Sequence, residues 1–252
     1  MPKFPVDEWR VLLLRLTGFP AGEMPSADGR QWWQDVVGTA PETRVVKARS
    51  ATVEESGPLP EPNSQAKLTV VSDPNRVDLK LTAQDVNVGS LAPDDIGILS
   101  SGLPVIAQLG RRWLTTGRAP ALKRVALGAV LIHPVASAEE GLSLLAGFLP
   151  NVTIPVGASD LLYRINRRRQ SKVVAEMQLN RLSTWSVGAT TLVRMEPAAN
   201  VSVTSSAPSC VLEFDVNTPA DRTAPLLVGE LPALLDEMAG LATEIAAEGD
   251  IP

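Results

Sequence analysis

The sequence predicts an α+β fold made of two similar halves, each an antiparallel sheet covered by a helix. Residues 76–82 alternate between apolar and polar side chains, which is typical of a strand with one dry face and one wet face. Residues 98–114 and 225–247 place apolar side chains three or four positions apart, the spacing of a helix with one buried stripe. Strands and helices of this kind favour a sheet with helices packed on one side.

The same landmarks recur in both halves of the chain. An Asp-Val-Asn triplet closes an alternating segment at residues 85–87 and again at 215–217, about 130 residues later. Each triplet is followed by an Ala-Pro pair, a Leu-Pro pair and an apolar helix. Turns and helix-opening prolines are common where a strand meets a helix, so an unduplicated chain also fits. We favour a duplication, with one half at residues 1–135 and the other at 136–252, or a single continuous domain.

The first half is predicted to contain four strands before its helix. Pro93 is expected to open that helix, with Asp94 and Asp95 in the first turn, where acidic side chains suit the helix dipole. Pro104 predicts a kink or a break in it. A short helix is expected at 28–37. The predicted strands are 9–17, 44–54, 67–72 and 76–82.

Residues 125–132 are almost wholly apolar, as in a central strand covered on both faces. This strand belongs to either half or joins the two sheets. A helix follows at 137–149, with Glu139 and Glu140 near its start. The strands predicted for the second half are 160–166, 173–182, 185–195 and 209–216.

Composition and charge narrow the class of protein. The chain has 252 residues, of which 44% are hydrophobic and 20% charged, so we expect a folded globular protein. Its net charge of -5 disfavours a dedicated nucleic-acid coat. Cys210 is the only cysteine, which excludes an intrachain disulfide and a cysteine zinc cluster and suits a reducing compartment. No apolar run approaches the length of about 18 residues that spans a bilayer. We therefore expect a soluble cytoplasmic protein with no membrane contact.

The order of elements resembles an uncharacterised bacterial family of similar length that is scattered sporadically across genomes. The shared features are an N-terminal apolar strand at 9–17, a mid-chain apolar strand at 123–135, an Asp-x-Asn-Thr strand end at 215–218 and a C-terminal helix. The family's mid-chain Arg-Tyr-x-Asn signature is replaced here by Arg-Val-Ala-Leu at 124–127. The resemblance implies a duplicated α+β fold and no established activity. Because such families often serve mobile or defence loci, it also implies an accessory role in antiviral defence.

The residues offer little support for catalysis. His133 is the only histidine, so a histidine metal site has no second ligand. A catalytic thiol at Cys210 needs a nearby base, and only His133 is available. Neither a phosphate-binding Gly-Lys-Ser/Thr loop nor a Gly-x-Ser-x-Gly elbow occurs. We expect no enzyme, no cofactor and no metal.

A basic segment at residues 164–172 is the most suggestive binding feature. Guanidinium groups suit bidentate contact with phosphates or carboxylates, so the segment predicts binding of nucleic acid, a nucleotide or an acidic protein surface. The alternative is a solvated turn that pairs with the protein's own carboxylates. The cations concerned are Arg164, Arg167, Arg168, Arg169 and Lys172, followed by Arg181.

Trp32 and Trp33 suggest an interface. Adjacent positions on a helix diverge by about 100°, so both rings cannot face inward on one stripe. We expect one ring to be exposed or capped by another surface, as in a homo-oligomer.

The sequence is compatible with three functions. The first is a non-enzymatic binding or adaptor protein that contacts a protein partner. The alternative is nucleic-acid or nucleotide binding through residues 164–172. The third, an enzyme that uses carboxylates, has the least support.

Overall fold

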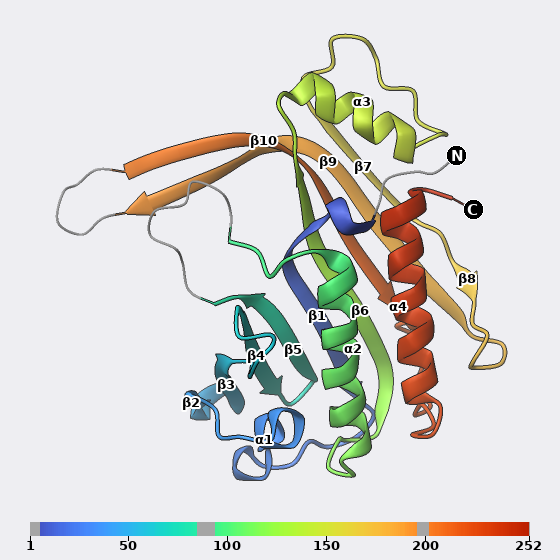
Figure 1. Cartoon of the computed structure of the whole chain (residues 1–252). Helices are drawn as coiled ribbons and strands as arrows, with labels where there is room; N and C mark the ends of the chain where they lie inside the picture. The colour runs from blue at the N-terminus through green and yellow to red at the C-terminus, as the bar shows by residue number, and fades with distance from the viewer. Residues whose placement is uncertain (1–5, 85–93, 196–201, 252) are drawn as a thin grey trace.

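All ten strands of the described residues belong to one antiparallel sheet, and four α-helices accompany it (Figure 1). The computed structural model describes residues 6–84, 94–195 and 202–251. The strands are β1 (Arg10–Pro20), β2 (Thr43–Lys47), β3 (Thr52–Pro58), β4 (Ala66–Asp73), β5 (Arg76–Ala83), β6 (Leu122–Pro134), β7 (Leu161–Asn166), β8 (Arg169–Gln170), β9 (Gln178–Met195) and β10 (Ser202–Asn217). The helices are α1 (Trp32–Val37), α2 (Leu99–Thr115), α3 (Ala138–Phe148) and α4 (Leu231–Glu248).

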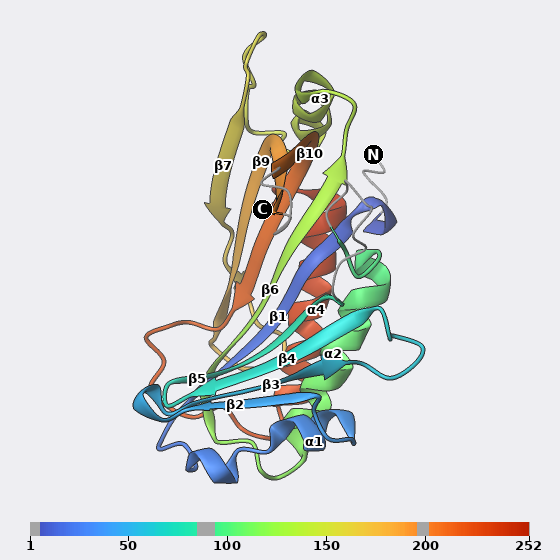
Figure 2. The ribbon, with the colours of Figure 1, turned by 90° about the vertical axis from the view of Figure 1, so that its left-hand side faces the viewer.

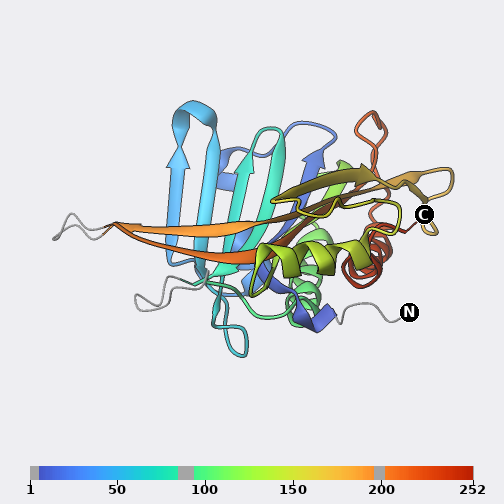
Figure 3. The ribbon, with the colours of Figure 1, turned by 90° about the horizontal axis from the view of Figure 1, so that it is seen from above.

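The sheet runs in the order β2-β3-β4-β5-β1-β6-β10-β9-β7, with β8 beside one end of β9. The strands at its two ends run in clearly different directions, because the sheet is strongly twisted (Figure 3).

One face of this sheet, here called the covered face, packs against the helices. The apolar side chains of alternate strand positions point to it, among them Leu16 of β1 and Leu212 of β10, and all of these are buried. Helix α2 crosses β1 and contacts α4, which in turn contacts β10 (Figure 3). Gly110 of α2 permits this crossing, because a Cβ atom there would collide with the side chains of Leu16 and Leu235.

The intervening strand positions point to the opposite side, here called the open face. In Figure 2, α2 and α4 lie behind the strands, and β1, β6, β10, β9 and β7 present this face. Its central positions mix small, polar, charged and half-buried apolar side chains, as expected where a sheet meets water.

Two sequence predictions about the N-terminal strands are confirmed. The strand predicted at 9–17 is β1, and the hairpin predicted at 67–82 is β4 and β5. Its turn is closed by Asp73, whose Oδ1 accepts hydrogen bonds from the backbone N–H groups of Asn75 at 2.7 Å and Arg76 at 3.1 Å.

Strand β6 joins what the sequence predicts as two sheets. It corresponds to the apolar run at 125–132 and hydrogen-bonds β1 on one side and β10 on the other. Leu127 pairs with Leu16 of β1 and with Val216 of β10, so apolar side chains of three strands lie in one row. The predicted boundary at residue 135 falls directly after this strand.

The helix predicted to open at Pro93 begins later. Pro93 lies outside the described residues, and the helix starts at Leu99, so Asp94 and Asp95 are not in its first turn. The reason is tertiary, because backbone hydrogen bonds to the start of β1 hold residues 96–98 in a non-helical conformation.

Other element bounds also differ from the prediction. Pro104 lies within α2, which continues from Leu99 to Thr115, so the predicted break does not occur. The segment 44–54 contains two strands, β2 and β3, separated by a short 3-10 helix. The predicted strands 173–182 and 185–195 are one strand, β9, that begins at Gln178.

The expectation that Trp32 or Trp33 exposes a ring is wrong. Both side chains are only 1% exposed within the single chain. The ring of Trp32 packs edge-on against Trp113 of α2, with centroids 6.2 Å apart. The ring of Trp33 lies against Gly57 of β3. Helix α1 therefore lies between two elements of its own chain and buries two different sides, which leaves neither ring available to a partner.

Candidate functional site

The predicted basic segment is divided between the two faces of the sheet. In β7 the half-buried residues Leu161, Tyr163 and Ile165 alternate with exposed ones. This alternation continues beyond the strand, so Arg167 is half-buried and Arg168 is exposed. The segment consequently does not form one cationic surface.

Arg167 binds Asp250, which follows α4. Its Nε and Nη2 donate to the two carboxylate oxygens of Asp250 at 2.7 and 3.0 Å, and the hydroxyl of Tyr163 donates to Asp250 Oδ2 at 3.0 Å. The Asp250 side chain is fully buried. Its pKa is lowered, chiefly by the hydrogen bonds from Arg167. This bidentate pair fastens the residues after α4 to the edge of the sheet.

Arg169 and Arg181 bind helix α4. Both donate to Oε1 of Glu244, at 2.9 and 3.2 Å. Burial lowers the pKa of Arg181, whose side chain is only 2% exposed. The backbone N–H of Lys172 donates to Glu237 of the same helix at 2.6 Å, whereas the Lys172 side chain is exposed. Three of the six predicted binding cations thus pair with carboxylates of this chain.

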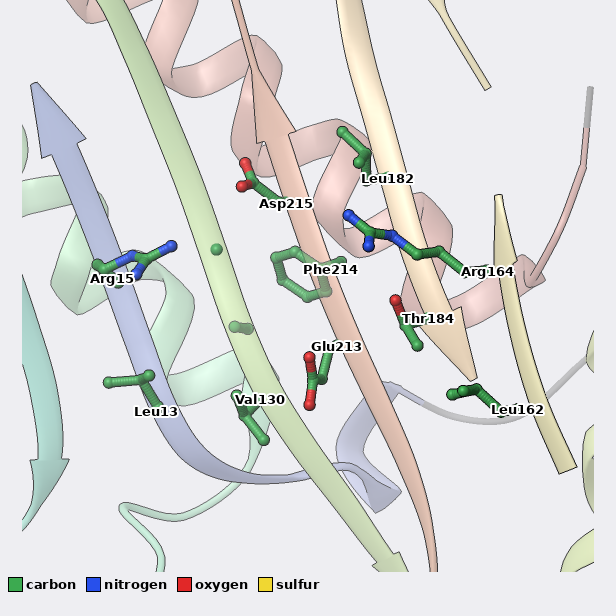
Figure 4. A pocket seen from close by; sticks show the side chains of 12 residues that line it. Leu13, Arg15, Val130, Leu162, Arg164, Leu182, Thr184, Glu213, Phe214 and Asp215 are labelled. Carbon is green, nitrogen blue, oxygen red and sulfur yellow. The ribbon is translucent and has the colours of Figure 1, made fainter. Parts of the chain in front are cut away.

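Arg164 instead lines a pocket on the open face. The pocket has a volume of about 460 Å³ and spans five adjacent strands, β1, β6, β10, β9 and β7 (Figure 4). Its base contains Gly128, which has no side chain, and the half-buried apolar side chains of Leu13, Val130 and Leu182. The exposed Leu162 lies at the outer edge, on β7.

Charged groups of both signs converge in this pocket. Arg15 extends from β1 and Arg164 from β7, and they point toward each other across the carboxylates of Glu213 and Asp215 on β10 (Figure 4). The strand register places Arg15 in one row with Gly128 and Asp215. It places Arg164 in the adjacent row with Glu213.

The two pocket arginines differ from those on the covered face in their pairing. Within residues 6–84, 94–195 and 202–251, neither the Arg15 nor the Arg164 side chain makes a hydrogen bond or an ion pair. Asp215 accepts a hydrogen bond from Asn217 Nδ2 at 2.9 Å, which holds that carboxylate in place. The pocket therefore presents guanidinium groups that an incoming ligand can pair with.

No family model, curated protein or solved structure matches this chain.

Cys210 and His133 are neighbours but do not form an activated pair. They face each other in the register of β10 and β6. The thiol of Cys210 is directed to the carbonyl of Gly141 at 3.5 Å, and burial raises its pKa to about 11. His133 Nδ1 lies 3.2 Å from the carbonyl of Glu8, and its ring packs edge-on against Trp9. A thiol with this pKa stays protonated at neutral pH and is a weak nucleophile.

One member of each acidic pair noted in the sequence has a structural partner. Asp95 accepts two hydrogen bonds from Arg10, at 2.7 and 3.0 Å. Glu140 accepts from the backbone N–H of Ala136 at 2.7 Å, and the backbone N–H of Glu140 donates to Oγ of Ser137, the N-cap of α3, at 3.1 Å. Across the described part of the chain, no group of three histidine, cysteine or carboxylate side chains is arranged to hold a metal ion. None of the helices described has the length and apolarity required to cross a bilayer.

The sequence analysis missed three of the four charged residues of the pocket. Arg15 was part of an apolar strand, and Glu213 and Asp215 were the polar side of an alternating one. The available signal was a charge at an open-face position of a central strand, but recognising it requires the order of the strands.

Proposed function

We propose that this chain is a non-catalytic binding protein that holds a segment of a protein partner on the open face of its sheet. The observation that carries the proposal is the unpaired state of Arg15 and Arg164 within the described residues. By contrast, the guanidinium groups of the same segment that lie toward the covered face pair with carboxylates of this chain, as Arg167 does with Asp250. Guanidinium groups that converge on a pocket favour a carboxylate-bearing ligand, because the two groups match in charge and planar geometry.

The carboxylates of the pocket favour a protein segment over a nucleic acid. Glu213 and Asp215 lie between the two arginines, so a strand of phosphates across the pocket would meet two negative charges. The net charge of -5 acts in the same direction at long range. A polypeptide carries charges of both signs and can match both pairs.

The test is selection of a displayed random 12-residue peptide library on the immobilised protein. Peptides enriched on the wild type are expected to lose binding to the double variant Arg15→Ala/Arg164→Ala. They should retain it on Arg168→Ala, a matched control because Arg168 is an exposed arginine of the same segment that does not line the pocket. The proposal fails if no peptide is enriched, or if the enriched peptides bind the double variant equally well.

A second arm of the same test addresses nucleic acid. A fluorescent single-stranded 20-mer oligonucleotide in 50 mM salt is expected to show no binding that depends on Arg15 and Arg164. Tight, salt-sensitive binding that the double variant abolishes would contradict the choice of a protein ligand.

We also propose that the two halves arose by duplication, so that the pocket lies across related modules. The order of elements supports this. After β1 come α1, β2, β3, β4, β5 and α2, and after β6 come α3, β7, β8, β9, β10 and α4. In the sheet, β1 and β6 are adjacent, and β5 and β10 flank them on either side. Of the two repeated triplets, 215–217 ends β10, and 85–87 lies outside the described residues.

A further inference from the structure

We infer that the pocket recognises an extended peptide in which a basic side chain is flanked, two residues away on either side, by acidic side chains. This inference rests on the proposed function, and it specifies the partner segment by the order of its charges.

The order of charges across the open face supplies the argument. From β1 to β7 the pocket presents a guanidinium, two carboxylates and a second guanidinium (Figure 4). Two strand spacings, about 10 Å, separate β10 from β1 and again from β7. Arg15 and Arg164 lean inward from the two ends and shorten both intervals.

An extended peptide matches this order when it crosses the strands. Residues i, i+2 and i+4 of such a peptide point to the same side, at intervals of about 7 Å. An acidic residue at i then meets Arg15, a basic residue at i+2 meets Glu213 and Asp215, and an acidic residue at i+4 meets Arg164. Long acidic and basic side chains can bridge the remaining few ångströms at each end.

The base of the pocket suits close approach of such a peptide. Gly128 lies between Arg15 and Asp215, and an added Cβ there would be 3.9 Å from Arg15 Nη2. The missing side chain leaves this space to the ligand. Leu13, Val130 and Leu182 provide apolar surface for the methylene groups of the acidic and basic side chains. The volume of about 460 Å³ is in the lower part of the range for ligand pockets, which suits a few side chains.

Simpler ligands leave charges unmatched. A ligand with acidic groups alone pairs with the arginines but places further negative charge beside Glu213 and Asp215. A ligand with a single basic group pairs with the carboxylates and leaves both guanidinium groups unpaired. Only the acidic–basic–acidic order pairs every charged group of the pocket, which is why it sets specificity.

The experiment measures fluorescence anisotropy of three labelled, end-blocked peptides in 50 mM salt. The first has the core sequence Glu-Thr-Lys-Thr-Glu, the second has the same composition in the order Glu-Glu-Lys-Thr-Thr, and the third has the reversed charges Lys-Thr-Glu-Thr-Lys. The first peptide is expected to bind at least about tenfold more tightly than either of the others. Equal affinity of the first two peptides would overturn the inference.

Charge reversal separates recognition from a structural role of the arginine. Arg164→Glu is expected to shift preference to a peptide with the core Glu-Thr-Lys-Thr-Lys, whereas Arg168→Glu leaves preference unchanged. An unchanged preference in Arg164→Glu would also overturn the inference. If library selection yields peptides that depend on Arg15 and Arg164 but lack this charge order, the proposed function stands and this inference fails. If selection yields none, both fail.

Discussion

Arg164 and Arg167 are three residues apart in the same basic segment, yet they do different things. Arg167 is bound to the buried carboxylate of Asp250, whereas Arg164 lines an open pocket and has no partner within the described residues. The alternation of the strand directs one to the covered face and the other to the open face. A run of cations in the sequence is therefore not necessarily a cationic surface, since strand geometry can divide it between the core and the solvent.

The difference has a clear energetic basis. A guanidinium near the covered face loses water and requires a carboxylate in return, which is the role of Asp250 and Glu244. A guanidinium on the open face stays hydrated and needs no internal partner. Substitutions on the covered face should therefore reduce stability, and those on the open face should reduce binding.

The largest loss of stability is expected from removing a buried aromatic side chain of α1. Trp33→Ala should lower the free energy of unfolding by about 3–5 kcal/mol, because removal of the buried indole leaves a cavity. The measurement is urea unfolding, with Leu162→Ala as control, since that open-face side chain is 76% exposed and its loss should cost under about 0.5 kcal/mol. A loss below about 1 kcal/mol for Trp33→Ala would contradict the burial of this ring.

Breaking the Arg167–Asp250 pair is expected to have the next largest effect. Arg167→Ala should lower the free energy of unfolding by about 2–4 kcal/mol, because it leaves a buried carboxylate without its main partner. Arg164→Ala should change it by less than about 0.5 kcal/mol. Equal losses in the two variants would refute the division of the basic segment.

A smaller loss of stability is expected from a change in the backbone after α4, which tests how this segment is held against the rest of the fold. Gly249 has a φ of 80°, and a Cβ there would collide with the carbonyl of Phe148. Gly249→Ala should therefore reduce stability by about 1–3 kcal/mol in thermal unfolding. Gly147→Ala is the matched control, because it lies in α3 with nothing near its Cβ position and should be neutral or slightly stabilising. Loss of stability in the control alone would reverse this interpretation.

The pH dependence of folding stability should also arise on the covered face. The pKa of Asp250 is lower in the folded chain than its unfolded value of about 3.9. The ionised carboxylate therefore contributes its full stabilisation of the fold at pH values above the unfolded pKa. This stabilisation is lost as the pH falls through the pKa of the folded chain. Wild type should lose stability more steeply than Asp250→Asn between about pH 4 and pH 2, as followed by urea unfolding at each pH. Parallel curves would show that Asp250 does not contribute in this way.

Local patterns in the sequence predict much of this fold. The β4–β5 hairpin follows from strict alternation and from the turn at Asp73, and α3 follows from its capping residues. The start of α2 does not, because pairing of residues 96–98 with β1 delays it. The double burial of Trp32 and Trp33 likewise depends on elements that enclose α1 from two sides.

The candidate site is less predictable for the same reason. Only Arg164 of the charged pocket residues was found from the sequence. Arg15, Glu213 and Asp215 lie on strands that are far apart in the chain but only two positions apart in the sheet. No local signal specifies that β6 pairs with both β1 and β10, and the pocket depends on that arrangement.

The most direct test of the account is an NMR titration of the 15N-labelled protein with a peptide selected on the wild type. The account predicts shift changes at the amides of Arg15, Gly128, Thr184 and Asp215, with little change along α2 and α4. Changes concentrated on α4, or on the exposed side chains of Arg168 and Lys172, would contradict it.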